Sequence, residues 1–302
     1  MNQARVTLDK IIDGTARDTE LEAFVFFGGC PIDLLSGFAD ESSLGDIDIS
    51  VPGIGTEQMD RYESTVQRNG YTITTARRLY VISRNIPVFT TFARNENTVI
   101  DANFMEDPTR VGLFNIDSMY VVFPERKIVD LYGSLEGLKS KTIVPIHDLS
   151  SESPYFLGSR FIYISSKYDI SMVDRNNIGV AEAVVRHMIN EPRDQRGEFN
   201  SFLPSVFKSI LRTRDRVSYL REMIEIGILN PRLSELETAI KQVMAGQHSH
   251  EMEKIEKVDD LIVFFAGYIP QPLKGNFYEK IKPLSDRIWE NDNRRVSEIP
   301  HK

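Results

Sequence analysis

The sequence predicts an α+β fold in which residues 1–150 form a mixed β-sheet with helices and residues 151–302 form an all-helical neck and body. Two observations support this division. Short apolar segments bounded by turn-forming residues recur up to about residue 145, as strands do. From about residue 154 onward the apolar residues take the spacing of helices, most clearly over 205–229. At 302 residues, the chain is long enough for two ordinary domains.

Five segments of the first half have the pattern of strands: residues 23–27, 46–51, 87–94, 98–104 and 126–131. The third and fourth are separated by Asn95, Glu96 and Asn97, a turn-forming cluster that predicts a β-hairpin. Between the second and third, residues 56–70 have helical spacing and end at Gly70, a residue type common at helix C-termini.

The composition is that of an ordinary globular protein, with 41% hydrophobic and 26% charged residues. No apolar run is long enough to predict a membrane span, and the first residues lack the pattern of a signal peptide. The single cysteine, Cys30, excludes an intramolecular disulfide framework and favours a cytoplasmic location. A net charge of −8 argues against a uniformly basic surface for nucleic acid but leaves room for a local basic groove.

Asp46 and Asp48 lie two residues apart in the segment DIDIS. Because strand side chains alternate between faces, both carboxylates and Ser50 are expected on one face, with Ile47 and Ile49 on the other. Adjacent like charges repel, so one carboxyl would protonate unless a cation neutralised the pair. Oxygen-only ligands favour Mg²⁺.

The same alternation applies to a third carboxylate, Asp101 in TVIDANF. Ile100, Ala102 and Phe104 are expected on one face of the strand and Asp101 on the other. If this strand lies beside the first, Asp46, Asp48 and Asp101 converge and can hold two Mg²⁺ ions for phosphoryl transfer. Three other interpretations stay open: surface aspartates, a calcium site, and the Asp-x-Asp of a glycosyltransferase. Aspartate is depleted in strands, which weighs against the first of these.

Gly28 and Gly29 end the strand over 23–27 and precede a short helix that begins near Pro31. Glycines in such a turn allow backbone N–H groups to approach a triphosphate closely, beside the N-terminus of a helix. Cys30, next to this turn, is expected to be a small packing residue.

The sequence resembles the DNA polymerase β nucleotidyltransferase superfamily in the order of its features: a strand, Gly-Gly, a helix, Asp-x-Asp and a later carboxylate. It is more closely similar to the bacterial poly(A) polymerase and CCA-adding tRNA nucleotidyltransferase branch. The branch motif GG-x-VRD-x-LLG is matched by GGCPIDLLSG, in which Gly28, Gly29 and Asp33 are kept and Ile32 replaces the arginine. The stretch 127–144 and the pair Arg160-Phe161 also resemble the branch.

The resemblance implies a template-independent enzyme that transfers a nucleotide from a nucleoside triphosphate to an RNA 3′ end, with tRNA as the first acceptor to test. It implies catalysis and metal binding by the three aspartates. It also implies contacts to the triphosphate from Gly28, Gly29 and Asp33. Arg160 and Lys167, which lie near the neck, are further candidates for triphosphate contacts. A protein or small-molecule hydroxyl is the alternative acceptor, favoured by the acidic net charge. A binding protein without activity is the third hypothesis.

The residues that read the base in this branch are not conserved in type. The branch motif Glu-Asp-x-x-Arg corresponds to residues 152–156, where Ser153 replaces the acid and Phe156 the arginine. Neither side chain offers the original donor and acceptor pattern. Tyr155 and Phe156 are expected in the core rather than stacked on a base.

The region from residue 186 to 221 is locally basic, with eight Arg and Lys against four acids, a net charge of +4. Its basic residues are Arg186, Arg193, Arg196, Lys208, Arg212, Arg214, Arg216 and Arg221. An RNA-binding surface, carried mainly by Arg193, Arg196, Lys208, Arg212 and Arg214, and a solvated helix surface are equally compatible with it. His248, Ser249 and His250 are expected in a polar loop rather than a metal site. Oligomeric state is not predicted.

Overall fold

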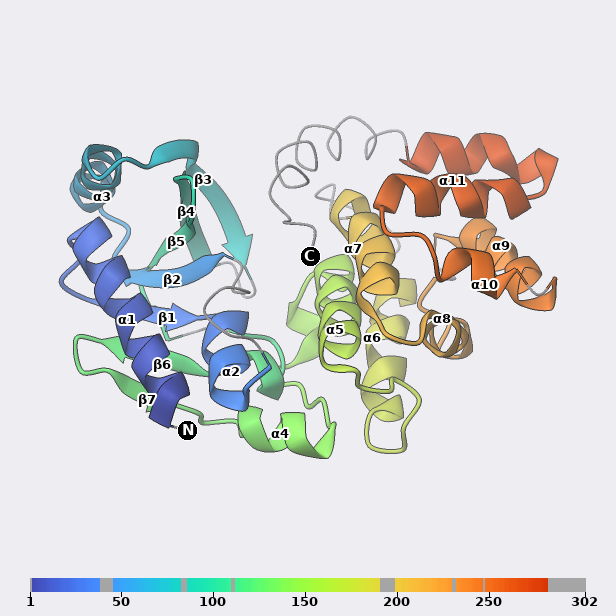
Figure 1. The fold of residues 1–302 in the computed structure, drawn as a ribbon, viewed down its shortest axis with the longest axis horizontal. Coiled ribbons are helices and arrows are strands. Elements are labelled where there is room, and N and C mark those ends of the chain that lie inside the picture. The colour runs from blue at the N-terminus through green and yellow to red at the C-terminus, as the bar shows by residue number, and fades with distance from the viewer. Residues whose placement is uncertain are drawn as a thin grey trace. The chain divides into compact units, whose positions relative to one another are not determined.

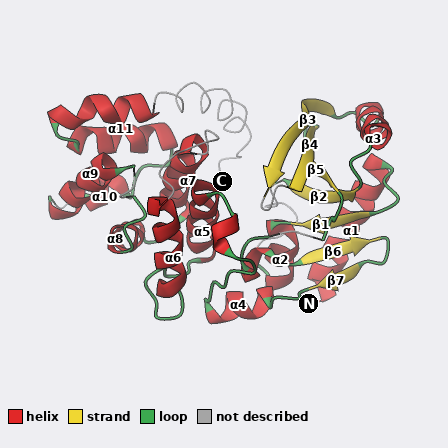
Figure 2. Cartoon of the chain, turned by 180° about the vertical axis from the view of Figure 1, so that it is seen from behind, coloured by secondary structure: helices red, strands yellow, loops and turns green. Residues whose placement is uncertain are grey.

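The computed structural model describes residues 2–38, 46–82, 86–109, 112–190, 199–229, 232–246 and 248–281. The chain forms two compact units, residues 1–152 and 153–302, so the division lies beside the expected boundary after residue 150 (Figure 1). The first unit combines a sheet with helices and the second is helical in its described residues (Figure 2). The predicted α+β class is therefore confirmed.

In the described residues of the first unit, a seven-stranded sheet has the order β3-β4-β5-β2-β1-β6-β7. Its strands are β1 (Phe24–Phe27), β2 (Ile47–Pro52), β3 (Thr72–Ile82), β4 (Ile86–Arg94), β5 (Val99–Met105), β6 (Tyr120–Phe123) and β7 (Lys127–Val129). Neighbouring strands are antiparallel except for β2 and β5, which are parallel. The parallel pair brings together two strands that lie far apart in the sequence.

The helices of this unit are α1 (Asn2–Thr19), α2 (Gly29–Ser36), α3 (Thr56–Arg68) and α4 (Ser134–Ser140), with 3₁₀ turns η3 (Asn115–Asp117) and η4 (Leu149–Ser151). Helices α1, α2 and α3 share one apolar core with the sheet. Leu8 of α1, Tyr62 of α3 and Phe104 of β5 are fully buried in it, and Tyr62 packs edge-on against Phe104. Cys30 is buried in the same core, as expected.

The hairpin predicted from residues 95–97 is present, because β4 and β5 pair antiparallel and the Asn95 N–H donates to the Thr98 carbonyl. The predicted helix over 56–70 is α3, which ends at Arg68 and is followed by Gly70 with a φ of 86°. Helix α1 and strands β3 and β6 were not predicted. The arginines and the irregular pairing near Arg77 obscure the alternation of β3, whereas the aromatic and β-branched run of β6 offered a signal.

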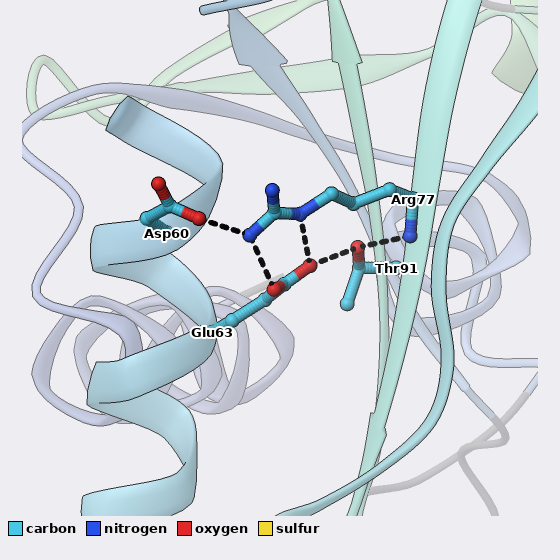
Figure 3. A network of polar contacts seen from close by, with 4 residues as sticks. All are labelled: Asp60, Glu63, Arg77 and Thr91. Carbon is cyan, nitrogen blue, oxygen red and sulfur yellow. Dashed lines mark hydrogen bonds and ion pairs between the residues drawn. The ribbon is translucent and has the colours of Figure 1, made fainter. Parts of the chain in front are cut away.

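A polar network fastens α3 to the β3–β4 hairpin (Figure 3). The Arg77 guanidinium donates to both carboxylate oxygens of Glu63, at 3.0 and 2.7 Å, and also binds Asp60. The Thr91 hydroxyl donates to Glu63 and accepts from the backbone N–H of Arg77. Arg77 has a φ of 48°, so its backbone departs from regular strand geometry where this network forms. The network therefore joins a helix and two strands at a strand irregularity.

The second unit contains α5 (Pro154–Tyr168), α6 (Ile178–Asn190), α7 (Phe199–Arg212), α8 (Arg216–Glu225), α9 (Ser234–Ala245), α10 (Ser249–Met252) and α11 (Val258–Tyr268), and residues 271–281 are also helical. The helical stretch expected over 205–229 is divided between α7 and α8. The Asp215 carboxylate caps α8 by accepting from the Ser218 N–H at 2.9 Å, and such capping favours a new helix start. Within the described residues, no helix is long and apolar enough to cross a membrane.

Candidate active site

The two faces of β2 and β5 differ as the sequence pattern predicted, with one exception. Ser50, expected on the open polar face with the aspartates, is fully buried and its hydroxyl donates to Met105 Sδ. Ile49, Ile100 and Phe104 are fully buried on the face that packs against the helices. Asp48 and Asp101 occupy alternate positions, and they are direct partners in the parallel β2–β5 register. Both are half-buried. The carboxylates of two strands that lie 53 positions apart in the sequence thus come side by side on one sheet surface.

Asp46 lies just before β2 rather than within it, and it is exposed. Its negative charge nevertheless raises the pKa of Asp101, as does that of Asp48. The three aspartates singled out from the sequence are therefore electrostatic neighbours. Asp46 differs from the other two in that no strand fixes it.

Gly28 lies against the Asp48 carboxylate. It has a φ of 79° and immediately precedes α2, which begins at Gly29. A Cβ atom at Gly28 would overlap with Asp48 Oδ2 and lie 3.0 Å from its Cγ. Both the positive φ and this close approach require glycine. The partial positive charge of the helix N-terminus favours an anion at this place, either Asp48 or a phosphate.

Two further polar residues hold Asp101. The Asn103 amide donates to Asp101 Oδ1 at 3.1 Å, and the Thr90 hydroxyl donates to Asn103 Oδ1 at 2.7 Å. Thr90 is buried in β4 directly opposite Asn103. The hydroxyl therefore fixes which way the Asn103 amide faces, and the amide fixes one oxygen of Asp101. Sequence alternation placed Asn103 beside Asp101, but Thr90 becomes visible only through the hairpin register.

The pKa of Asp101 is raised to about 7, chiefly by burial and then by the charges of Asp48 and Asp46, while the Asn103 hydrogen bond lowers it. Burial, together with the charge of Asp101, also raises the pKa of the buried Tyr62 hydroxyl. A carboxyl that titrates near neutral pH can take up a proton during a reaction. The site therefore combines a negative field with a group able to move a proton.

The described residues contain no group of three or more His, Cys, Asp or Glu side chains already placed to hold a metal ion. This does not exclude Mg²⁺ on chemical grounds, because Mg²⁺ is commonly bound by one or two carboxylates together with water and substrate phosphates. Asp48 and Asp101 provide two adjacent carboxylates whose mutual repulsion a divalent cation would relieve. Their donor chemistry fits Mg²⁺, with Asp46 as a third, exposed carboxylate.

The remaining residues that the sequence predicted to bind the triphosphate or RNA differ in burial and in the unit to which they belong. Asp33 is buried in α2. In the second unit, Arg160 lies in α5 with its guanidinium 5.1 Å from the Tyr163 ring centroid. Lys208, Arg212 and Arg214 are exposed, whereas Arg193 and Arg196 lie outside the described residues.

Three sequence expectations in the second unit have different outcomes. Tyr155 is buried, as expected, but Phe156 is 49% exposed, so the prediction that it lies in the core was wrong: consecutive helix positions face different directions. Arg216 is buried and donates to the carbonyls of Met252 and Ile255, so it belongs to the core rather than to a basic surface. The prediction of a polar loop at His248, Ser249 and His250 was wrong for the last two, which lie in the short helix α10, while His248 precedes it with its Nδ1 3.6 Å from Glu251 Oε2.

No family model and no curated protein matches this sequence. Its fold is similar to that of a solved structure described as a tRNA-processing enzyme in an apo form, with a TM-score of 0.55 and 17% sequence identity. The match covers 89% of this chain and 76% of the other. The chain therefore shares its fold with a tRNA-processing enzyme.

Proposed function

We propose that this protein is a Mg²⁺-dependent nucleotidyltransferase that transfers a nucleotide from a nucleoside triphosphate to the 3′ end of an RNA, tRNA first among them. The observation that carries the proposal is the pairing of Asp48 with Asp101 beside the glycine turn that begins α2. Phosphoryl transfer requires negative charge to be held and stabilised in one place, and this arrangement suits that chemistry. The fold shared with a tRNA-processing enzyme supports RNA as the acceptor.

In the proposed reaction, the backbone N–H groups at the start of α2 hold the triphosphate, with Gly28 and Gly29 allowing its close approach. The 3′-hydroxyl oxygen forms a bond to the α-phosphorus, and the bond from that phosphorus to the bridging oxygen breaks. Asp101, oriented by Asn103, takes up the proton of the hydroxyl on its second oxygen, Oδ2. Bound at Asp48 and Asp101, Mg²⁺ would supply charge neutralisation for the phosphates and the departing pyrophosphate.

The test incubates the protein with Mg²⁺ and each α-³²P-labelled nucleoside triphosphate in turn, in the presence of tRNA, short RNA and total protein. The Asp48→Asn variant, which is nearly isosteric, is the matched control. We expect label in the RNA fraction with the wild type, and none with Asp48→Asn or after addition of EDTA. All four nucleotides are tested because residues 152–156 lack the base-reading pattern.

Label in the protein fraction would contradict RNA as the acceptor while retaining nucleotidyl transfer. Transfer that persists in the Asp48→Asn variant at the wild-type rate would contradict the site itself.

A further inference from the structure

The β3–β4 hairpin contains a β-bulge beside the candidate active site. Thr75 of β3 pairs with Phe92 of β4. The next pair along the hairpin joins Arg78 to Thr90, so β3 places two residues opposite a single residue of β4, Thr91. A bulge of this kind interrupts the hydrogen-bond ladder and increases the local twist, and bulges next to active sites serve to direct a side chain.

The polar network of α3 and the hairpin holds this bulge in place (Figure 3). The backbone N–H of Arg77, one of the two bulge residues, donates to the Thr91 hydroxyl at 3.2 Å, and that hydroxyl donates to Glu63 at 3.3 Å. The Arg77 guanidinium fixes the Glu63 carboxylate in turn through two hydrogen bonds. Arg77 is therefore bonded through both its backbone and its side chain, which holds it at its positive φ of 48°.

The network is largely shielded from water. Thr91 is fully buried, and only 15% of the Glu63 side chain and 34% of the Arg77 side chain are exposed. A buried polar group that loses its partner bears the full cost of its desolvation. Without the Thr91 hydroxyl, the Arg77 N–H loses the acceptor that the bulge provides. The hairpin is therefore expected to rearrange at this point when the hydroxyl is removed.

Thr90, the residue before Thr91, begins the hydrogen-bond chain that ends on Asp101. Consecutive strand residues point to opposite faces of a sheet, so Thr90 lies on the face of the aspartates while Thr91 faces α3. The Thr90 hydroxyl donates to Asn103 Oδ1 at 2.7 Å. The Asn103 amide then donates to Asp101 Oδ1 at 3.1 Å. The bulge therefore adjoins the first residue of this chain.

The two sets of hydrogen bonds meet at a single peptide unit, the one between Thr90 and Thr91. On one face of the sheet, α3 and β3 hold the Thr91 hydroxyl, and on the other face the Thr90 hydroxyl holds Asn103. A shift of this peptide unit therefore moves both hydroxyls. A displacement of about 1 Å caused by a change far from the reacting atoms can reduce a rate by about 10²-fold.

We propose that Thr91, Glu63 and Arg77 are positioning residues for the reaction. By fixing the bulge, they direct the Thr90 hydroxyl and so hold Asp101 in the orientation that accepts a proton. The positioning follows from contacts within the fold, and only the chemical role of Asp101 rests on the proposed function. A network that served only to fasten α3 to the sheet would leave the hydrogen-bond chain unchanged when it is removed.

The experiment compares the variants Thr91→Val and Glu63→Gln with the wild type. Valine keeps the branched shape of threonine and removes only the hydroxyl, and glutamine keeps the shape of glutamate without its charge. The matched control is Thr19→Val. Thr19 is a buried threonine at the end of α1. Its hydroxyl also makes two bonds, donating to the Thr15 carbonyl at 2.7 Å and accepting from the Leu21 N–H at 3.4 Å.

The first measurement is the NMR signal of the Asn103 side-chain amide in metal-free protein, identified by its absence in Asn103→Leu. We expect Thr91→Val and Glu63→Gln to shift this signal in the same direction as Thr90→Val does. The control Thr19→Val should leave it unchanged, because its lost bonds lie on α1. This measurement requires neither nucleotide nor RNA, so it tests the positioning without the proposed function.

The second measurement gives kcat and KM for nucleotide transfer. Thr91→Val should lower kcat about 3- to 10-fold, less than the loss of about 10- to 100-fold that is usual when a direct partner of a ligand is removed. KM for the nucleotide should change little. Because Thr91 is proposed to act through Thr90, adding Thr91→Val to Thr90→Val should cause no further loss. Thr19→Val should keep the wild-type kcat at a temperature where all variants are folded.

An Asn103 signal that moves in Thr90→Val but not in Thr91→Val would overturn the inference and leave the network with a structural role alone. Losses of kcat that multiply in the double variant would also overturn it. If the signal shifts as expected but the wild type transfers no nucleotide, the effect of the network on Asn103 stands and the proposed function is contradicted. The two failures are therefore distinguishable.

Discussion

On one face of β2 and β5, Ile49, Ile100 and Phe104 are sealed beneath helices, whereas on the other face Asp48 and Asp101 lie side by side. The same two strands carry both sets at alternating positions. Apolar burial on the first face supplies the energy that holds the strands together. That rigid pairing keeps two carboxylates together despite their repulsion. Substitutions on the two faces should therefore separate stability from activity.

The largest effect is expected from Asp48→Asn. This change removes the negative charge but keeps the shape of the side chain beside Gly28. Transfer activity should fall at least ~10³-fold, since several kcal/mol of transition-state stabilisation depend on this charge. The melting temperature should stay the same or rise, because a source of repulsion is lost. A large fall in melting temperature would show that the two faces are not separable in this way.

The opposite face is tested by Phe104→Ala. Phe104 is fully buried and packs edge-on against Tyr62 at 5.4 Å between ring centroids. Truncation should lower the free energy of unfolding by about 3–5 kcal/mol, as for other buried phenylalanines. Urea denaturation followed by circular dichroism measures the change. Protein that remains folded at low temperature should retain most of its activity, in contrast to the Asp48→Asn variant.

Gly28→Ala is expected to lower both stability and activity. Alanine at a φ of 79° is strained, and its Cβ would displace the Asp48 carboxylate. We expect a stability loss of about 1–2 kcal/mol from the backbone and a larger loss of activity, about 10²-fold. Gly37→Ala, at a similar φ of 73° but with no atom within 4 Å of its Cβ, is the matched control. Equal losses of activity in both variants would argue against a role for the Gly28–Asp48 approach.

A smaller effect is expected from Asn103→Leu. Leucine cannot donate to Asp101, so the carboxylate loses the bond that orients it. Activity should fall about 10- to 100-fold, the usual cost of losing a group that positions a metal or proton ligand. The loss should be in kcat, with little change in KM for the nucleotide. Thr90→Val, which frees the Asn103 amide, should show the same pattern more weakly.

The pH dependence of stability supplies the smallest expected effect. The pKa of Asp101 is raised to about 7 in the fold from a usual value of 3.8, so its proton stabilises the folded state. That contribution is complete below pH 3.8 and is lost as the pH rises through 7. In EDTA, the wild type should therefore lose about 1–2 kcal/mol between pH 6 and 8 relative to Asp101→Asn. Parallel melting curves for the two proteins across this range would contradict the assignment.

Much of the first unit follows from local patterns. Alternation in TVIDANF predicted which residues are buried, and residues 95–97 predicted the hairpin, because both signals are local. Alternation in DIDIS was correct for Ile49 and Asp48 but wrong for Ser50, which is fully buried. The parallel pairing of Asp48 with Asp101 was only a conditional expectation, since register between distant strands depends on tertiary contacts. The hydrogen-bond chain from Thr90 through Asn103 to Asp101 likewise depends on strand register, so the sequence alone did not predict it.

The second unit was less predictable. Helical spacing identified its class, but Asp215 divides α7 from α8 through a cap that involves only a few atoms. Arg216 looked like part of a basic surface, yet its guanidinium donates to buried carbonyls. Arg160 was assigned to the triphosphate from its place near the predicted neck, while its contact with Tyr163 depends on the fold. Charged residues on helices carry little information about what they contact.

The most direct test of the central claim is a double-mutant cycle on Asp48 and Asp101. Transfer rates are measured for the wild type, Asp48→Asn, Asp101→Asn and the double variant, at saturating Mg²⁺ and nucleotide. If the two carboxylates act as one unit, the double variant should lose about as much activity as either single variant. Losses that multiply, or a single variant with wild-type activity, would contradict the account.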